Sequence, residues 1–220
     1  MTFSIVAKDQ RTGAFGVATA TGGPAVGSLV PYARAGTGAV ATQGFTTNPF
    51  YGFEALELFA NDKSAQDVLD TLTNADTGRE RRQCLLIDQG GNTAAWTGSQ
   101  INETCGSILD QNIGVAGNLL TCPEVLENLI SAFRANPDQP IEDRLLHALT
   151  SAQAAGGDRR GTRSAALKVY TSELYPAVDI RVDWSISPIT ELAEILQATR
   201  GKDYAEFFDR LPSSSDPYSA

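Results

Sequence analysis

Strand-like apolar segments come in pairs along this chain, and pairs of helical segments separate them. Strand character is found in residues 3–7, 14–21, 38–43, 82–88, 93–97, 112–116, 163–170 and 178–183, with a Gly- and Pro-containing stretch at 22–36. Helical patterns begin near residue 49 and cover residues 64–73, 123–135, 141–154 and 188–199. A βαβ winding would alternate single strands with single helices, and this order does not. The sequence therefore predicts an α+β fold of layered, largely antiparallel sheets whose faces are covered by helices.

Local turn and cap signals support these boundaries. Residues 9–13 and 90–91 each separate two strand segments and are typical of hairpin turns. Asn48-Pro49 has the pattern of an N-cap followed by proline at the first helical position, and Ser64 with Asp67 predicts the start of the next helix.

A hydroxyl residue directly follows the initiator methionine and directly precedes the first strand segment. Removal of Met1 would leave Thr2 at the free N-terminus of a buried strand. The α-amine of such a threonine, with an ordinary pKa of about 7.7 to 8.0, can accept the proton of its own hydroxyl during nucleophilic attack. The pattern predicts an N-terminal nucleophile, although many chains begin with Met-Thr for no catalytic reason.

Composition limits the partners of the chain. It has 220 residues, 42% of them hydrophobic, and a formal net charge of -9 with a pI near 4.6, values typical of one soluble domain with a substantial core. The negative charge repels phosphate backbones and anionic lipids, so we expect no nucleic acid partner. No apolar run is long enough to span a bilayer and no basic-then-apolar leader precedes Thr2, which predicts no membrane association and a cytoplasmic location. Cys84, Cys105 and Cys122 have the spacing of reduced thiols rather than of a disulfide framework or a zinc site.

Residue counts set aside several familiar chemistries. The only histidine, His147, lies in an amphipathic helical segment, where a partly exposed helix position is expected rather than a Ser-His-Asp or Cys-His site. One histidine and scattered cysteines argue against a transition-metal site. Residues 36–41 match the dinucleotide pattern G-x-G-x-x-A, but a strand follows where that motif requires a helix. We therefore expect no metal and no cofactor.

Two glycine-containing segments remain as candidate sites. The first is Gly114-Val115-Ala116-Gly117-Asn118, where a backbone N–H could face a developing oxyanion; its structural alternative is an ordinary strand-to-helix turn. The second is residues 156–164, which place Arg159, Arg160 and Arg163 in an acidic protein. Guanidinium groups bind carboxylates or phosphates in a bidentate fork, although a solvated turn, with Asp158 holding one arginine in place, explains the same residues.

Four segments together resemble a bacterial family of unknown function that is classed among the N-terminal-nucleophile hydrolase-like proteins. They are Thr2-Phe3-Ser4-Ile5-Val6-Ala7, residues 30–43 (VPYARAGTGAVATQ), residues 154–161 (AAGGDRRG) and residues 178–183 (VDIRVD). The resemblance runs in order from residue 2 to about residue 196. It implies a four-layer αββα sandwich of two largely antiparallel sheets, with the nucleophile at the start of the first strand. Residues 1–200 are then expected to form this domain, and residues 201–220 a C-terminal helix and flexible tail, frayed from residue 212.

The resemblance also implies roles for individual residues. Thr2 occupies the position of the superfamily nucleophile, and the loop that ends in Gly117 and Asn118 resembles the one that supplies oxyanion contacts. The candidate substrate-binding residues are Gln43, Asp158, Arg159, Arg160 and Arg163. The chain departs from the family pattern in having Val115-Ala116-Gly117-Asn118 in place of V-Q-G-N, Cys105-Gly106-Ser107 in place of a G-H-R-like element, and Thr21-Gly22-Gly23-Pro24 in place of a bulkier S-K-F-F-like segment.

Three functional hypotheses follow. The first is hydrolysis of a small amide substrate by Thr2, with its α-amine as base. The second is a catalytically silent protein of the same fold that binds a small anionic ligand through the arginines of residues 156–164. The third is a structural or assembly role. The expected partners are a small-molecule substrate or ligand and, in a homodimer, a second copy of the chain.

Overall fold

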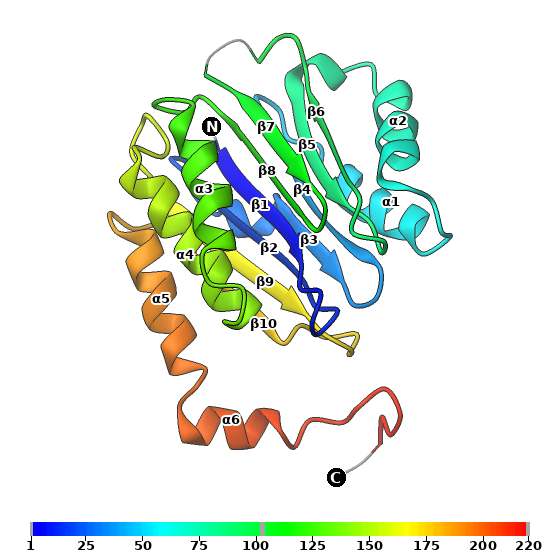
Figure 1. The fold of residues 1–220 in the computed structure, drawn as a ribbon, viewed down its shortest axis with the longest axis vertical. Coiled ribbons are helices and arrows are strands. Elements are labelled where there is room, and N and C mark those ends of the chain that lie inside the picture. Colours follow the sequence, from blue (N-terminus) through cyan, green and yellow to red (C-terminus); the bar gives the residue numbers. More distant parts are fainter. Residues whose placement is uncertain (1, 102–103, 219–220) are drawn as a thin grey trace.

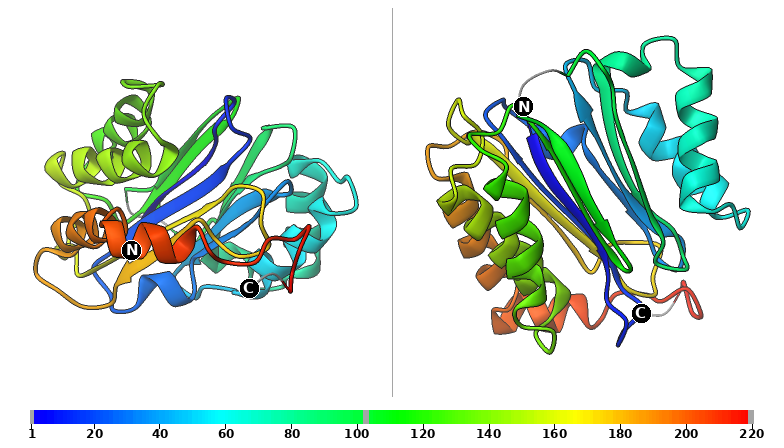
Figure 2. Two further views of the ribbon diagram at one scale, coloured as in Figure 1. Left: turned by 90° about the horizontal axis from the view of Figure 1, so that it is seen from below. Right: turned by 45° about the horizontal axis from the view of Figure 1, so that its top comes forward.

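Two β-sheets pack face to face, and helices cover both outer faces (Figures 1 and 2). The computed structural model describes residues 2–101 and 104–218, so the expected removal of Met1 lies outside the described residues. The order of layers is helix, sheet, sheet, helix. This arrangement confirms the α+β class, the four layers and the two antiparallel sheets.

The larger sheet has six strands, and the first strand of the chain runs through its interior. Its order is β10 (Val178–Val182), β9 (Ser164–Tyr170), β2 (Phe15–Thr21), β1 (Thr2–Lys8), β8 (Ile113–Asn118) and β7 (Gly106–Asp110), with every neighbour antiparallel. Thr2 lies opposite Asn118 in the register of β1 and β8. The start of the chain is therefore held on both sides by neighbouring strands.

The smaller sheet has four strands, which are also antiparallel throughout. Its order is β3 (Pro31–Arg34), β4 (Gly38–Gly44), β5 (Arg82–Ile87) and β6 (Thr93–Thr97). Short 3-10 turns lie at Val26–Ser28, before β3, and at Arg79–Arg81, before β5.

Three hydrophobic layers hold the sandwich together, because side chains on a strand alternate between its two faces. Phe3 and Ile5 of β1 pack under α3 (Glu124–Arg134), α4 (Ile141–Ala154) and α5 (Pro188–Ala198). Val6 instead packs between the sheets, with residues such as Phe15 and Leu85. A third layer lies under α1 (Phe50–Phe59) and α2 (Ala65–Ala75). Thr2 and Ser4 alternate with Phe3 and Ile5, so they face the space between the sheets.

The cap predicted at Ser64 is confirmed, because Ser64 accepts a hydrogen bond from the backbone N–H of Asp67 at the start of α2. At α1 the N-cap residue is Pro49, one residue later than predicted, and the side chain of Asn48 accepts a hydrogen bond from the backbone N–H of Phe50. Helix α6 (Lys202–Phe208) lies beyond α5 and extends away from the body of the sandwich (Figure 1).

Two strands were missing from the sequence prediction, and both are edge strands. Strand β3 lies inside the stretch that was interpreted only as Gly- and Pro-containing; it has four residues and begins with Pro31, a position where a missing N–H is tolerated. Strand β7 begins at Gly106 and exposes much of its length, so it lacks the apolar alternation of a half-buried strand.

Within the described residues, no helix combines the length and the apolar character needed to cross a bilayer.

The packing of α1 on β4 generates a stability prediction. A Cβ at Gly38 would lie 2.4 Å from the carbonyl oxygen of Ile87 and 2.9 Å from the ring of Phe59, whereas one at Gly23 would meet nothing within 4 Å. We expect Gly38→Ala to lower the free energy of unfolding by about 1–3 kcal/mol through overpacking. Gly23→Ala, the matched control, should stay within about 0.5 kcal/mol of the parent. Urea unfolding of both variants measures the difference, and equal stabilities would contradict this account of the β4 contact.

Candidate active site

The layer between the sheets changes from apolar to polar toward the end of the sandwich where β1 begins. Its apolar part includes Val6, Val17 and Leu85. Beyond it lie buried polar side chains from five strands: Thr2, Ser4, Thr19, Thr21, Gln43, Gln83 and Asn118. Buried polar groups are costly unless they are hydrogen-bonded. The bonds of this cluster, which we call the inter-sheet polar cluster, therefore decide what it can do.

Gln83 of β5 sets the direction of the hydrogen bonds. Its Nε2 donates to the backbone carbonyl of Gly117 at 2.9 Å and to that of Gly106 at 3.3 Å. Carbonyl oxygens only accept, so the amide of Gln83 has one permitted orientation. Its Oε1 then accepts from Gln43 Nε2 at 2.7 Å and from Asn118 Nδ2 at 2.9 Å.

The orientation of the Gln83 amide determines the orientations of the Gln43 and Asn118 amides. Gln43 must turn its Oε1 away from Gln83, and that oxygen accepts from the hydroxyl of Ser4 at 2.7 Å. Asn118 must turn its Oδ1 away as well, and this buried oxygen has no hydrogen-bond partner among the described residues. The network therefore presents one unsatisfied acceptor beside Thr2, which is the register partner of Asn118.

Thr2, on the strand next to Asn118, lies close to another hydroxyl residue. Its side chain is 6% exposed, and its hydroxyl lies 3.3 Å from that of Thr21 on β2. Gln43 Nε2 also lies 3.4 Å from the carbonyl oxygen of Thr2. These contacts come from β2 and β4, and β8 pairs with β1 at Thr2, so Thr2 is held by regular structure rather than by a loop.

Arg160 and Asp158 adjoin the same group of hydroxyls. The guanidinium of Arg160 donates to both carboxylate oxygens of Asp158, at 3.3 and 3.1 Å, and its Nη2 lies 3.5 Å from the hydroxyl of Thr21. Asp158 is 2% exposed and also accepts from the backbone N–H groups of Gly22 and Arg160. A Cβ at position 22 would lie 2.9 Å from the carboxylate oxygens, so this contact requires glycine.

The remaining arginines of residues 156–164 lie elsewhere. Arg159 is exposed, and its backbone N–H faces the carbonyl of Leu119. Arg163 directly precedes Ser164, the first residue of β9, and its side chain lies on the helix side of the sheet, where its guanidinium lies 5.9 Å from the ring of Trp184. There it lines a pocket of about 480 Å³ together with Thr162 and the start of α5. The structure thus brings Arg160 to the side of Thr2 and separates Arg163 from it.

Other reactive groups lie away from this cluster. His147 is exposed on α4. All three cysteines are free, and burial raises the pKa of the Cys84 thiol to about 12. Across residues 2–101 and 104–218, no three or more His, Cys, Asp or Glu side chains gather closely enough to hold a metal ion.

Sequence reasoning missed four members of the inter-sheet polar cluster: Ser4, Thr19, Thr21 and Gln83. A signal for three of them was present, because hydroxyl residues repeat at every second position in Thr2–Ser4 and in Thr19–Thr21, inside otherwise apolar strands. Period-two spacing places such residues on one face. Gln83 has no such partner in its own strand, and only the facing sheet reveals its role.

A scan against protein-family models matches residues 2–192 to the Family of unknown function (DUF1028). The chain belongs to this family. Its fold is similar to that of the crystal structure of protein SPO2555 from Silicibacter pomeroyi, described as a member of the same family, at 36% sequence identity and a TM-score of 0.92, covering 99% of this chain and 98% of that one. Anbu (ancestral beta-subunit) from Yersinia bercovieri is also similar, at 12% identity and a TM-score of 0.44, covering 96% of this chain and 98% of that one. A comparison with curated proteins finds no match.

The fixed orientation of Gln83 can be tested by a nearly isosteric change. Gln83→Glu places a carboxylate oxygen against the carbonyls of Gly117 and Gly106, so we expect a loss of about 2 kcal/mol or more in unfolding free energy at pH 8. The buried acid should have a folded-state pKa above its unfolded value of about 4.3, so the deficit should shrink as the pH falls and the carboxyl group regains a proton to donate.

The control is Gln139→Glu, which makes the same change at an exposed position before α4. Urea unfolding at pH 8 and pH 5 should show a large, pH-dependent deficit for position 83 and a change within about 0.5 kcal/mol for position 139. A Gln83→Glu variant as stable as the parent at pH 8 would show that the amide does not have this orientation.

Proposed function

We propose that this protein is an N-terminal-nucleophile amidohydrolase in which Thr2 attacks a small amide substrate. The observation that carries the proposal is the place of Thr2: at the start of the central strand β1, between two sheets, and opposite a buried acceptor that lacks a donor. The sequence resemblance to N-terminal-nucleophile hydrolases and the four-layer sandwich both support this assignment.

The proposed reaction begins after Met1 has been removed. The α-amine of Thr2 accepts the proton of the Thr2 hydroxyl as Oγ1 attacks the carbonyl carbon of the substrate. The C–N bond then breaks, the leaving amine takes the proton from the α-ammonium group, and an acyl-threonine ester remains. Water, deprotonated by the same α-amine, attacks this ester; the C–Oγ1 bond breaks, Oγ1 takes the proton back from the α-ammonium group, and the carboxylic acid leaves. Each step balances without a metal or a redox partner.

Asn118 has a specific place in this scheme. We propose that its Oδ1 accepts a hydrogen bond from an N–H of the Thr2 α-amine. This bond would satisfy the buried acceptor that has no partner among the described residues of the cluster. The expected oxyanion contacts of Gly117 and Asn118 stay a prediction. The carbonyl of Gly117 and one hydrogen of Asn118 Nδ2 are engaged by Gln83, which leaves the second Nδ2 hydrogen of Asn118 for that purpose.

Substrate binding is assigned to residues around the same end of the sandwich. Arg160 lies next to Thr21 with its guanidinium oriented by Asp158, and Gln43 lies next to Thr2. A fixed guanidinium at this distance favours a substrate with an acidic group near the scissile amide. Arg159, which is exposed and directly precedes Arg160 in the chain, stays in the proposed binding set as a prediction.

A second candidate function has its own supporting observation. Arg163 has no ion pair among the described residues, and it lines the pocket of about 480 Å³ at the start of α5. This arrangement supports binding of a small anionic ligand without catalysis by Thr2. The two functions are separable, because Arg163 and Thr2 face opposite sides of the six-stranded sheet.

Covalent capture tests the proposed nucleophile directly. Protein whose N-terminus is Thr2 is incubated with p-nitrophenyl acetate, quenched in acid so that the protonated α-amine cannot take the acetyl group from the ester, and digested with pepsin in acid to release the N-terminal peptide. We expect acetylation of this peptide on the Thr2 hydroxyl, seen by mass spectrometry. Thr2→Ala should lose the acetyl ester with little change in melting temperature, because one small hydroxyl is removed.

The control retains the hydroxyl and removes the base. A chain extended by residues that block methionine removal keeps Thr2 but has no α-amine on it, and it should not be acetylated at the Thr2 hydroxyl. Equal ester formation in the extended chain would contradict a role of the α-amine. Absence of the ester in the processed chain, together with anion binding that Arg163→Met abolishes, would favour the second function.

A further inference from the structure

A separate hollow lies at the other end of β1, where the first strand leaves the sheet. It has a volume of about 240 Å³ and is bounded by the turn after β1, the start of β8 and the α3–α4 connection. Strand β1 extends over seven residues, which places this hollow roughly 20 Å from Thr2. Any ligand here would be independent of the inter-sheet polar cluster.

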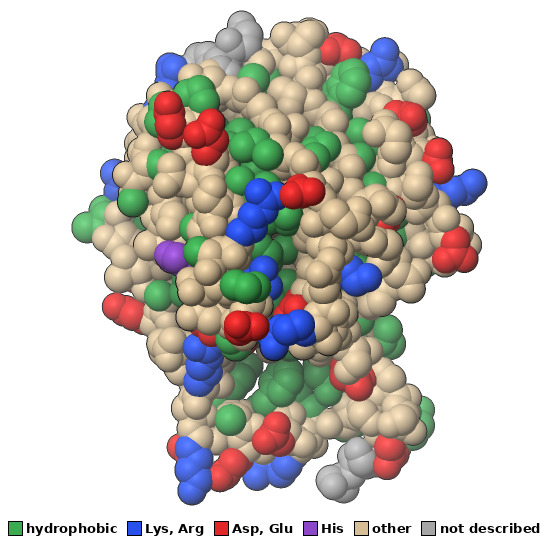
Figure 3. Space-filling view, viewed as in Figure 1, with side chains coloured by type: hydrophobic (Ala, Val, Ile, Leu, Met, Phe, Trp, Pro, Cys, Tyr) green, Lys and Arg blue, Asp and Glu red, His purple; other side chains and the backbone are tan. Residues whose placement is uncertain are grey.

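Positive charge surrounds this hollow in a chain whose net charge is -9. Its lining contains Lys8, Arg11, Arg134 and Arg144 against two acids, Asp9 and Asp138. Figure 3 shows basic side chains gathered around apolar ones in the middle of this face, over the region between α3 and the β7–β8 hairpin in Figure 1. The local field therefore favours an anion, although the chain as a whole is acidic.

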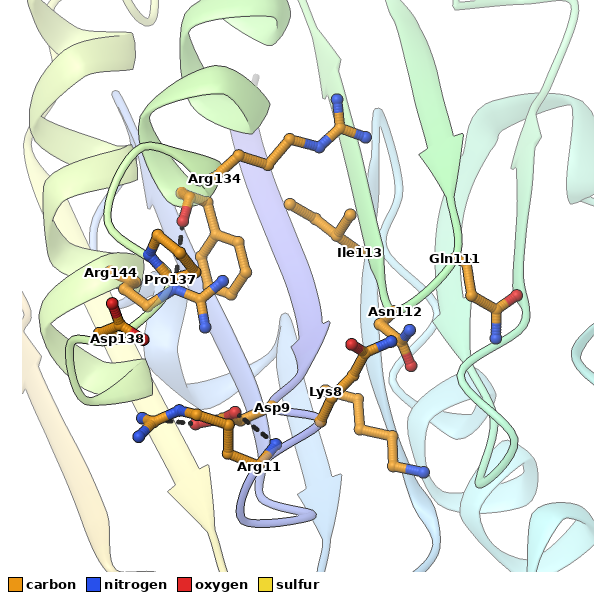
Figure 4. Close-up of a pocket in the computed structure, with 12 residues that line it drawn as sticks. Lys8, Asp9, Arg11, Gln111, Asn112, Ile113, Arg134, Pro137, Asp138 and Arg144 are labelled. Carbon is orange, nitrogen blue, oxygen red and sulfur yellow. Dashed lines mark hydrogen bonds and ion pairs between the residues drawn. The ribbon is translucent and has the colours of Figure 1, made fainter.

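Three of the four cations are already engaged at the rim. Arg11 forms an ion pair with Asp9 at 3.5 Å, and Arg134 forms one with Asp110. Lys8 donates to the carbonyl of Gln89 at 2.7 Å. In Figure 4 the side chains of Lys8 and Arg134 extend away from the centre of the hollow.

Arg144 differs from these three in position and in bonding. Its guanidinium lies 3.9 Å from the ring centroid of Phe133, and its Nε donates to the carbonyl of Phe133 at 3.1 Å. These contacts fix the group while its two Nη atoms have no partner among the described residues (Figure 4). Burial lowers the pKa of Arg144, but an arginine stays protonated at neutral pH. The result is a half-buried, oriented guanidinium that forms no ion pair within 4.0 Å among the described residues, although the charges of Asp9 and Arg11 both act on it.

We propose that this hollow, the Arg144 pocket, binds a small organic carboxylate. The two Nη donors of a fixed guanidinium match the two oxygens of a carboxylate. Ile113, Phe133 and Pro137 supply apolar walls for the carbon chain of the ligand, and Gln111 and Asn112 lie at the rim. The volume is below the roughly 300–1,000 Å³ of pockets for drug-sized ligands, which limits the ligand to a few carbon atoms.

The charge balance also favours a monoanion. After the pairs with Asp9 and Asp110 are formed, the unpaired cations are Arg144 and Lys8, and Asp138 offsets one of them. One net positive charge suits one carboxylate better than a phosphate dianion. Because Arg144 is held in place before binding, little conformational entropy is lost when the ligand arrives.

The experiment titrates sodium butyrate and sodium benzoate into the full chain at constant ionic strength, with sodium chloride as the reference salt. Amide resonances of residues 111–113, 133–136, 138 and 144 should shift in a saturable way that chloride does not reproduce. Arg144→Met, which keeps an apolar stem on Phe133, should weaken binding at least about tenfold, and Arg144→Lys should weaken it less, because a point charge remains without the fork.

The matched control is Arg181→Met, which removes the same charge from an exposed residue paired with Asp183 on another edge of the sheet. It should leave binding within about twofold of the parent. Circular dichroism checks that each variant is folded. Shifts absent from the pocket residues, shifts equal to those with chloride, or equal weakening by Arg181→Met and Arg144→Met would each overturn the proposal.

Discussion

The side-chain amide of Gln83 is the contact on which the candidate active site depends. It joins the two sheets by donating from β5 to the backbone carbonyls of Gly117 on β8, which pairs with β1, and of Gly106 on β7, the next strand. Those carbonyls can only accept hydrogen bonds, so the orientation of the Gln83 amide is fixed, and it fixes in turn the orientations of the Gln43 and Asn118 amides. A single donor therefore determines which atom of Asn118 bonds to Gln83 and which is left without a partner.

This network explains how a polar site survives inside a sandwich. Two sheets normally meet through apolar side chains, as they do here around Val6 and Leu85. At the end near Thr2 the same layer is polar, but almost every group has a partner, so little of the desolvation cost remains. The exception, Asn118 Oδ1, lies where the proposed mechanism supplies an amine. We interpret this single unsatisfied acceptor as a sign of function, because buried polar groups in native proteins are rarely left without a partner.

Much of the fold was predictable from the sequence, because its main signals are local. Alternating apolar residues, the caps at Asn48 and Ser64, and the glycine turns mark most strands and helices within one or two residues. The edge strands β3 and β7 were missed because exposed, short strands carry little alternation. The site was less predictable. Thr2 and Asn118 were named from the sequence, but the role of Gln83 depends on sheet-to-sheet contact, which no local pattern encodes.

The arginines of residues 156–164 show the same limit. In the sequence the three arginines lie within five residues of one another. In the structure Arg160 adjoins Thr21, whereas Arg163 lies on the opposite face of the sheet beside Trp184. Side chains alternate between the two faces of a strand, so the face of Arg163 follows from the position at which β9 begins. That position, Ser164, was not known from the sequence.

A high-resolution crystal structure of the chain processed to Thr2 tests the central claim most directly. The account predicts the α-amine nitrogen of Thr2 within hydrogen-bond distance, about 3 Å, of Asn118 Oδ1, with the Thr2 hydroxyl beside that amine. An α-amine directed to solvent, with Asn118 Oδ1 satisfied by another group, would contradict it.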